Sequence, residues 1–365
     1  MKRVLDRKSK RVPIVLLGLG GVGLSLLERI VKNREYHADR YSLTVDVVAV
    51  ADSRGAVTAQ NGCLCDPELG EVIQTKKLGL PLSRVLHGYS ERNPLELVNE
   101  SCGVSTVLVD CTATSATEDA LLRALEVGGK IVLANKKPLT GDFGLYSELT
   151  RDPSRSRWET TVGSSLPVIN ALSRITASGD RVSSIAGSFS GTLGLLMTSL
   201  HEGRPFGETI IGAHEAGYTE PDPREDLCGV DVARKALILA RGAGWNQDLS
   251  DVEVESLVPD GLSRLSPQGF LDKVGKFDSA LAGRAKECRG RGRVLRYVAS
   301  VERDSCRVGL TEVGESSPLG RLRGNDNLAE IYTELFSPNP LIIQGRGAGV
   351  DATAAGVLSD LLELA

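Results

Sequence analysis

Residues 12–23 read VPIVLLGLGGVG, and the fold predicted for the first part of the chain starts from them. The run 12–17 is short, apolar and followed by glycines, which is typical of a buried strand. The next residues, 24–33, carry apolar side chains at helical spacing. The sequence therefore predicts a strand, a glycine turn and a helix.

The glycine turn has the spacing GxGxxG, which is found where a dinucleotide binds. The first glycine of such a turn allows a tight bend, the second lets the backbone approach a pyrophosphate, and the third lets helix and strand pack closely. The helix N-terminus adds N–H donors and partial positive charge. The predicted contacts to a dinucleotide are Gly18, Gly20, Gly21, Val22 and Gly23. A glycine-rich turn without a ligand is the alternative.

A second predicted strand, residues 45–52, ends at Asp52, where a ribose-binding acid is expected. The polar insert 34–42 accounts for an interval that is longer than usual. Arg54 lies two residues on and would suit a 2′-phosphate. The acid favours NAD and the arginine tolerates NADP, so the preference stays open. Asp52 as a simple turn residue is the alternative.

The pattern continues with strands at 105–112 and 130–136 and a helix at 118–128. Alternating strands and helices predict a parallel sheet with right-handed crossovers, which is the α/β class. A polar segment, 151–158, marks a domain boundary. Three parts are expected: a Rossmann-like NAD(P)-binding domain at 10–157, an α+β substrate-binding and dimerisation domain at 158–335, and a strand–helix segment at 336–365 that packs back on the first domain. Residues 56–100 are the hardest to interpret, with one helix expected from Pro94 to Glu100.

Composition excludes several classes of protein. A chain of 365 residues is too long for one ordinary core. A net charge of -4 gives no support for a nucleic-acid or anionic-membrane partner. Seven scattered cysteines form no metal-ligand framework and indicate reduced thiols in the cytoplasm. The basic start lacks the apolar core of a signal peptide, and no run of about 18 apolar residues could span a membrane.

The segment 213–244 is the most informative part of the second domain. Glu220 and Asp222 each precede a proline, which favours extended backbone. Asp226 is predicted to cap a helix that runs from 227 to about 243 and is apolar on nearly every side.

Within that helix Asp231 and Lys235 are four residues apart and share a face. A charge pair on a buried helix is costly unless polar groups meet it. The functional interpretation is a polar pocket in which the acids bind a cationic amine of the substrate and the lysine interacts with the oxygen that reacts. A helix salt bridge beside a solvated loop is the alternative. Lys136, after the fourth strand, is a second candidate lysine, with a surface loop as its alternative. The four histidines form no motif.

Residues 216–235, AGYTEPDPREDLCGVDVARK, resemble the signature of the homoserine dehydrogenase family. Supporting matches are ANKKPL at 134–139, ETTVGSSLP at 159–167, SGTLG at 190–194 and QGRGAGVDATAAGVLSDLL at 344–362. The similarity runs from about residue 12 to 365 and is weakest at 56–100. It resembles the monofunctional members without an ACT domain, which leaves threonine feedback open.

The resemblance implies NAD(P)-dependent, reversible oxidation of L-homoserine to L-aspartate 4-semialdehyde, in threonine, methionine and isoleucine biosynthesis. It implies Lys235 as the acid/base and Lys136 as a second catalytic lysine. Implied substrate contacts are Glu220, Asp226, Asp231 and Thr192, and further cofactor contacts are Thr112, Lys136 and Gly217. A sodium ion would be held by Glu159, Val162, Ser164 and Leu166, whose oxygen ligands suit a hard cation. A homodimer is expected.

Two other functions compete with this one. An aspartate-semialdehyde dehydrogenase would need an activated cysteine, for which Cys111 is the candidate, although no histidine is placed by any motif to activate it. A cofactor-sensing or scaffold protein would bind NAD(P) without turnover.

Overall fold

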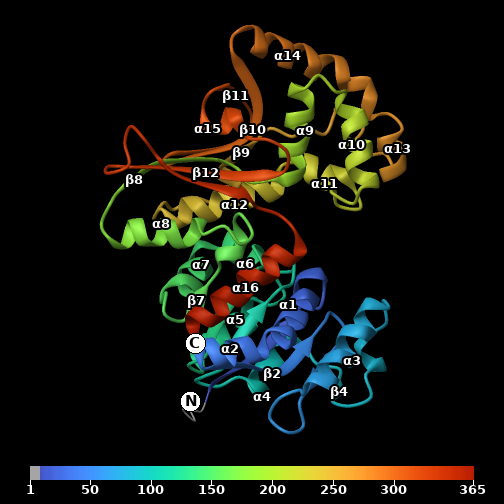
Figure 1. The fold of residues 1–365 in the computed structure, drawn as a ribbon, viewed down its shortest axis with the longest axis vertical. Coiled ribbons are helices and arrows are strands. Elements are labelled where there is room, and N and C mark those ends of the chain that lie inside the picture. The colour runs from blue at the N-terminus through green and yellow to red at the C-terminus, as the bar shows by residue number, and fades with distance from the viewer. Residues whose placement is uncertain (1–8) are drawn as a thin grey trace, which may run out of the picture. The chain divides into compact units, whose positions relative to one another are not determined.

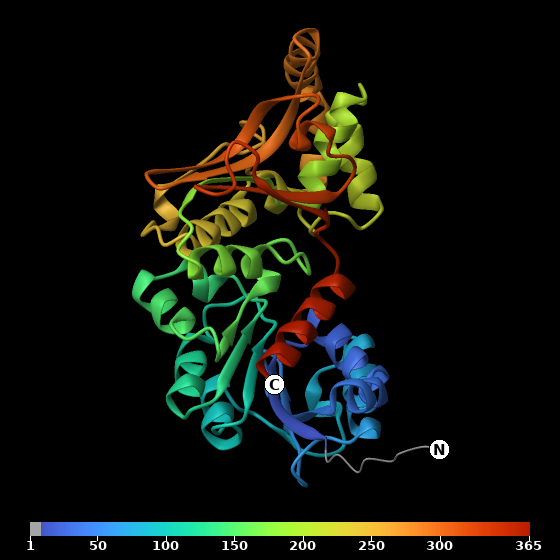
Figure 2. The same ribbon diagram turned by 60° about the vertical axis from the view of Figure 1, so that its left-hand side comes forward.

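The structure is a computed structural model that describes residues 9–365 (Figures 1 and 2). The basic stretch at 1–8, on which the signal-peptide prediction partly rests, lies outside the described residues. The chain divides into two compact units. The first runs to Thr161 and includes Gly349–Ala365, and the second is Val162–Ala348.

Within residues 9–365, the first unit contains a seven-stranded sheet of the order β4-β3-β2-β1-β5-β6-β7. Its parallel strands are, in spatial order, β2 (Leu43–Ala51), β1 (Lys10–Leu17), β5 (Val107–Asp110), β6 (Lys130–Leu133) and β7 (Ser156–Arg157). The antiparallel edge strands are β3 (Ala56–Thr58) and β4 (Tyr89–Ser90). This sheet is of Rossmann type, which confirms the predicted α/β class.

Helices connect most of these strands, as the alternating pattern predicts, and α16 packs on α1 from the end of the chain. They are α1 (Gly21–Lys32), α2 (Arg34–Tyr41), α3 (Asp66–Lys77), α4 (Pro94–Ser101), α5 (Glu118–Glu126), α6 (Lys137–Thr140), α7 (Phe143–Thr150) and α16 (Val350–Leu364), with the 3-10 turns η1 (Leu82–Arg84) and η2 (Glu159–Thr161). The polar insert at 34–42 forms α2 and ends at Ser42, whose φ of 54° is left-handed. The expected helix at Pro94 is α4, capped by Asn93.

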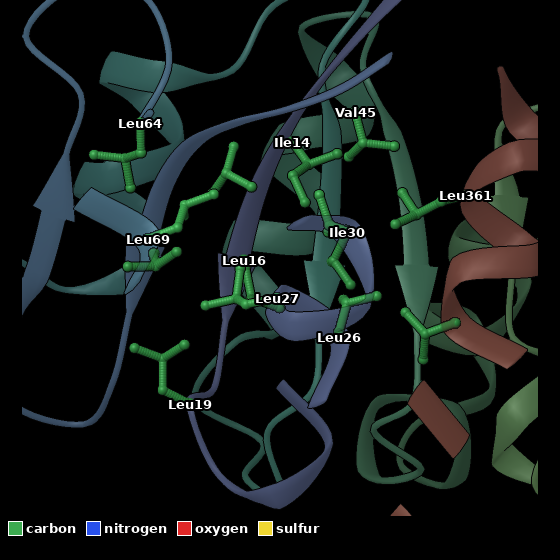
Figure 3. Packing of buried hydrophobic residues seen from close by; sticks show 14 of the residues in the cluster. Ile14, Leu16, Leu19, Leu26, Leu27, Ile30, Val45, Leu64, Leu69 and Leu361 are labelled. Carbon is green, nitrogen blue, oxygen red and sulfur yellow. The ribbon is translucent and has the colours of Figure 1, made fainter. Parts of the chain in front are cut away.

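The core of the first unit lies between β1, α1 and α16. Ile14, Leu26 and Leu361 are fully buried and belong to one apolar cluster (Figure 3). Burying a leucine contributes roughly 2 kcal/mol, so α16 is held to this unit by its apolar face. Two lysines bind the last carbonyls of α16: Lys10 bonds Ala365 and Lys130 bonds Leu364.

Within the described residues, the second unit contains a six-stranded sheet of the order β13-β12-β8-β10-β11-β9. The strands are β8 (Val182–Ser188), β9 (Val252–Val254), β10 (Arg293–Glu302), β11 (Ser305–Gly314), β12 (Asp326–Thr333) and β13 (Leu341–Arg346). The helices are α8 (Val168–Ala177), α9 (Gly191–His201), α10 (Phe206–Glu215), α11 (Pro223–Leu227), α12 (Val230–Gly242), α13 (Pro267–Leu271), α14 (Asp278–Gly290) and α15 (Pro318–Arg321), with η3 (Leu249–Asp251) and η4 (Val274–Phe277).

The C-terminal segment differs from the expectation for 336–365. Strand β13 pairs along its length with β12 in the second sheet, so its backbone hydrogen bonds are made there. Only α16 belongs to the first unit. The chain also passes between units after Thr161, four residues beyond the expected boundary.

The predicted helix at 227–243 is α12, which begins three residues later than expected, at Val230, because Gly229 takes a left-handed φ of 76° and separates it from the short helix α11. Asp222, rather than Asp226, caps α11 by accepting from the N–H of Arg224. The cap prediction for Asp226 was therefore wrong, and its carboxylate makes other contacts.

Among residues 9–365, no helix is both long and apolar enough to cross a membrane. All seven cysteines are free.

Gly229→Ala should lower the free energy of unfolding of the second unit by more than about 2 kcal/mol. A Cβ there would lie 2.1 Å from Tyr297 Oη, which is fixed by a 2.8 Å bond to the Glu255 carbonyl. Gly244→Ala is the matched control, since Gly244 has a φ of 86° with nothing near its Cβ position. Gly244→Ala should lower the free energy of unfolding only by the backbone strain of a left-handed alanine, about 1 kcal/mol. Urea unfolding measures both, and equal losses would contradict the argument.

Candidate active site

A cavity of about 1010 Å³ lies in the first unit at the carboxyl ends of β1, β2 and β5. Strand β1 stands between β2 and β5, so chain connections leave it in both directions. Ligands of open α/β sheets bind at such a point. The predicted cofactor residues that line the cavity are Gly18, Gly20, Asp52, Arg54 and Thr112.

The three glycines of the turn have different surroundings. A Cβ on Gly18 would lie 2.7 Å from the Cys111 carbonyl carbon, and Gly18 has a φ of 94°. A Cβ on Gly23 would lie 1.9 Å from the Gly18 oxygen. Nothing lies within 4 Å of a Cβ on Gly20. Packing of the turn therefore requires Gly18 and Gly23, while Gly20 leaves room for a ligand.

The other two predicted turn residues belong to the start of α1. Gly21 faces α16, where Val350 Cγ2 would be 3.0 Å from an added Cβ. Val22 packs against the apolar cluster of the unit. Neither is among the residues that line the cavity.

Asp52 is bound by a cation that the sequence analysis did not assign. Its Oδ2 is 2.7 Å from Lys76 Nζ, and its Oδ1 accepts from the N–H of Arg54 at 2.9 Å. Lys76 lies in the last turn of α3 and lines the cavity with Arg54. The segment 56–100 thus supplies a positive charge at the cavity, beside the acid that was predicted to bind the ribose.

Thr112 and Lys136 follow β5 and β6. The N–H of Thr112 donates to Asp110 Oδ1 at 2.9 Å. Lys136 is the N-cap residue of α6, and its carbonyl accepts from the Thr140 hydroxyl at 3.1 Å. Asn135, which the sequence analysis did not single out, is buried beside both loops.

The second unit brings together Lys235, Asp231 and the turn before α9. Lys235 Nζ lies 2.6 Å from Asp231 Oδ2 and donates to the Phe189 carbonyl at 2.7 Å. The lysine side chain is 14% exposed, whereas that of Asp231 is 48% exposed. An i,i+4 ion pair contributes only about 0.5 kcal/mol. The ion pair with Asp231 alone therefore does not explain why the Lys235 ammonium group is largely buried. The Phe189 carbonyl provides a second acceptor, which is fixed in the backbone.

Asp226 forms the acidic side of this group. Its Oδ2 accepts from the N–H of Glu220 at 2.8 Å, which ties the loop to α11. Burial raises the pKa of Asp226, hydrogen bonds from the Glu220 N–H and the Thr192 side chain oppose that shift, and the charge of Asp231 adds to it. The Asp231 carboxylate therefore acts on Asp226 in the same sense as burial, against the charged form of Asp226.

Thr192 and Gly217 belong to the same region of the second unit. The Thr192 hydroxyl, at the start of α9, donates to the Tyr218 carbonyl at 2.9 Å. Gly217 has a φ of 71° and is exposed, with nothing within 4 Å of a Cβ there. The backbone of 217–220 is therefore held at both ends, by Thr192 and by Asp226.

The four residues predicted to hold a cation divide between the units. Glu159 lies in η2 of the first unit, is 6% exposed, and donates its N–H to Asp360 Oδ2 at 3.1 Å. Val162, Ser164 and Leu166 begin the second unit. Ser164 has a left-handed φ of 59°. A buried carboxylate and a turn rich in backbone carbonyls have the chemistry that a hard cation requires.

Cys111 does not have the environment of a nucleophile. Burial raises the pKa of its thiol, and the charge of Asp110 adds to the shift. A reactive cysteine needs the opposite shift. This argues against the aspartate-semialdehyde dehydrogenase alternative.

Comparison with known proteins covers both units. The family model "Homoserine dehydrogenase" matches residues 167–362, and the model "Homoserine dehydrogenase, NAD binding domain" matches residues 18–159.

Two curated relatives and one solved structure are similar along most of the chain. The bifunctional aspartokinase/homoserine dehydrogenase of Haemophilus influenzae is 35% identical over 369 residues, 99% of this chain and 43% of that protein. The homoserine dehydrogenase of Emericella nidulans is 39% identical over 276 residues, 71% of this chain and 75% of that protein. A crystal structure of a Candida auris protein of unknown function is 31% identical, with a TM-score of 0.83 and 98% of each chain covered.

The chain thus spans less than half of the bifunctional relative, but most of the shorter one. Because the models match the nucleotide-binding unit and the unit that carries Lys235, the chain belongs to the homoserine dehydrogenase family.

Proposed function

We propose that the chain catalyses the NAD(P)-dependent, reversible oxidation of L-homoserine to L-aspartate 4-semialdehyde. The observation that carries this proposal is the placement of Lys235 in the family segment. Its amine is held by Asp231 and by the Phe189 carbonyl in a half-buried position. A surface salt bridge needs no such second acceptor.

Besides its bond to Cε, the Lys235 nitrogen has three positions. Asp231 and the Phe189 carbonyl take two of them, and the third is proposed to face the substrate oxygen. In the oxidising direction that position accepts the hydroxyl proton, and in the reducing direction it returns the proton to the aldehyde oxygen. A bound nicotinamide supplies the hydride acceptor or donor. Lys136 is proposed as the second lysine beside the substrate.

The acids of the second unit suit the ammonium group of homoserine. The backbone N–H of Glu220 donates to Asp226 at 2.8 Å, so Asp226 is tied to the loop that carries Glu220, and the charge of Asp231 acts on Asp226. Several carboxylates in one place are favourable once they share a cation. Thr192 supports this group by holding the Tyr218 carbonyl.

The cavity of the first unit is proposed to bind the dinucleotide and to accept NADP. Lys76 neutralises Asp52, and Arg54 adds a second positive charge at the cavity. A 2′-phosphate would then meet two cations, whereas NAD would use the Asp52 carboxylate.

Three further parts complete the proposal. The chain would form a homodimer through its second unit. It would act in the cytoplasm, for which the seven free cysteines are the support. Glu159, Val162, Ser164 and Leu166 would hold a sodium ion, which would fix the backbone of that segment.

Lys235→Met should lower kcat for homoserine oxidation by about 10³-fold, because general acid–base catalysis is lost. Absorbance at 340 nm measures turnover, and fluorescence titration should show an unchanged Kd for NADPH. Lys286→Met, which alters an exposed lysine of α14, is the control and should keep the wild-type rate. Wild-type kcat in Lys235→Met would remove Lys235 from the mechanism. NADPH binding without any turnover in the wild type would favour the sensing alternative.

Lys76→Ala should raise KM for NADP about tenfold or more, since a charge-assisted hydrogen bond is lost and Asp52 is left unneutralised. KM for NAD should stay or fall. The matched control is Lys77→Ala, because Lys77 is exposed and pairs with Glu28 outside the cavity. An equal loss with both cofactors would show that Lys76 does not recognise a phosphate.

Replacing sodium by choline at constant ionic strength should lower kcat/KM. Glu159→Gln should weaken this dependence, because the charged ligand is removed. Ser164→Gly keeps the backbone carbonyl and suits the φ of 59°, so it should respond to sodium as the wild type does. Identical rates in both salts would exclude a functional sodium ion.

A further inference from the structure

A buried carboxylate lies behind the wall of the cofactor cavity. Asp110, the last residue of β5, is 0% exposed. Its Oδ1 accepts from the Thr112 N–H at 2.9 Å, and its Oδ2 accepts from the Thr117 hydroxyl at 2.7 Å. Thr112 and Thr117 line the cavity, and Asp110 does not. The acid therefore acts on the shape of the wall and not on a ligand directly.

Asn135 joins this acid to the loop that follows β6. Its Nδ2 lies 3.0 Å from Asp110 Oδ2 and 2.7 Å from the Thr114 carbonyl. Its Oδ1 accepts from the N–H of Lys137 at 3.1 Å. One amide group thus holds the cavity wall through its nitrogen and the backbone on the far side of Lys136 through its oxygen.

The two residue types are suited to this arrangement. An aspartate only accepts, which matches the donors that converge on residue 110. An asparagine both donates to the carboxylate and accepts from the backbone. A second aspartate at 135 would place two carboxylates together in a buried position. A buried polar group that loses its partner is costly, so the geometry of this network is firmly held.

We infer that Asp110 and Asn135 are a positioning pair that sets the backbone of Lys136 relative to the cofactor cavity. The inference rests on the proposed function, in which Lys136 lies beside the substrate. Neither Asp110 nor Asn135 is among the residues that line the cofactor cavity. Its contribution to the rate passes through Lys136, because Asn135 precedes that residue and bonds the residue after it.

A double-mutant cycle tests this route. Asn135→Ala should lower kcat about tenfold or more, since small misplacements of a catalytic group are costly. The Kd for NADPH should change less than about threefold. In the Lys136→Met background the same substitution should change kcat by less than about twofold, because there is no amine left to position. If the fold-loss of kcat in the double variant equals the product of the losses in Asn135→Ala and Lys136→Met, the inference is overturned.

The matched control is Asn327→Ala in the second unit. Asn327 is 1% exposed and donates to the Gly347 carbonyl at 3.1 Å, so its loss also empties a buried amide site. Asn327→Ala should lower kcat by the same factor in the wild type and in the Lys136→Met background, because the two residues act independently. Thr117→Val removes one donor to Asp110 at nearly constant shape and serves if Asn135→Ala does not fold. Its smaller loss should likewise vanish in the Lys136→Met background, and persistence there would count against the pair.

Failure of the inference and failure of the proposed function give different results. Absence of homoserine turnover in the wild type would overturn both. Independent effects of the substitutions at 135 and 136 in an active enzyme would overturn only the inference.

Discussion

The close approach of the glycine turn to the end of β5 is the contact on which the nucleotide-binding unit depends. The backbone of Cys111 and Thr112 lies so near Gly18 that no Cβ fits there, and Gly23 packs on the Gly18 oxygen in the same way. These contacts bring the ends of β1 and β5 together, and the Gly18 N–H bonds the Ala51 carbonyl of β2. The ends of these three strands line the cavity, together with the glycine turn.

Two pairs of polar side chains near that contact join residues that are far apart in the sequence. Lys76 reaches Asp52 from α3, and Asn135 reaches Asp110 from the loop after β6. The first pair lies at the cavity surface and the second lies behind it. We therefore propose that the first pair affects which cofactor the cavity binds, whereas the second pair holds the cavity wall.

In the second unit, an interruption between two helices determines which partners the acidic side chains have. Gly229 takes a left-handed φ between α11 and α12, so the acids of the loop and of α11 do not lie on one continuous helix with Lys235. Asp226 is then available to the Glu220 N–H, and Asp231 begins α12 one turn before Lys235. Asp222, which looks equivalent in the sequence, instead binds Arg224, whose guanidinium also reaches the Leu265 carbonyl. Three similar acids thus have different partners.

The sequence by itself determined the strand–turn–helix pattern, the alternation of the first unit and the shared face of Asp231 and Lys235, because local periodicity and short spacing record burial directly. Tertiary structure alone decided the pairs Lys76–Asp52 and Asn135–Asp110, which are 24 and 25 residues apart. It also decided that β13 joins the second sheet while α16 joins the first unit, and that Asp226 is not a helix cap. The physical reason is that these features depend on strand order and on one left-handed glycine, and neither leaves a periodic signal in the residues themselves.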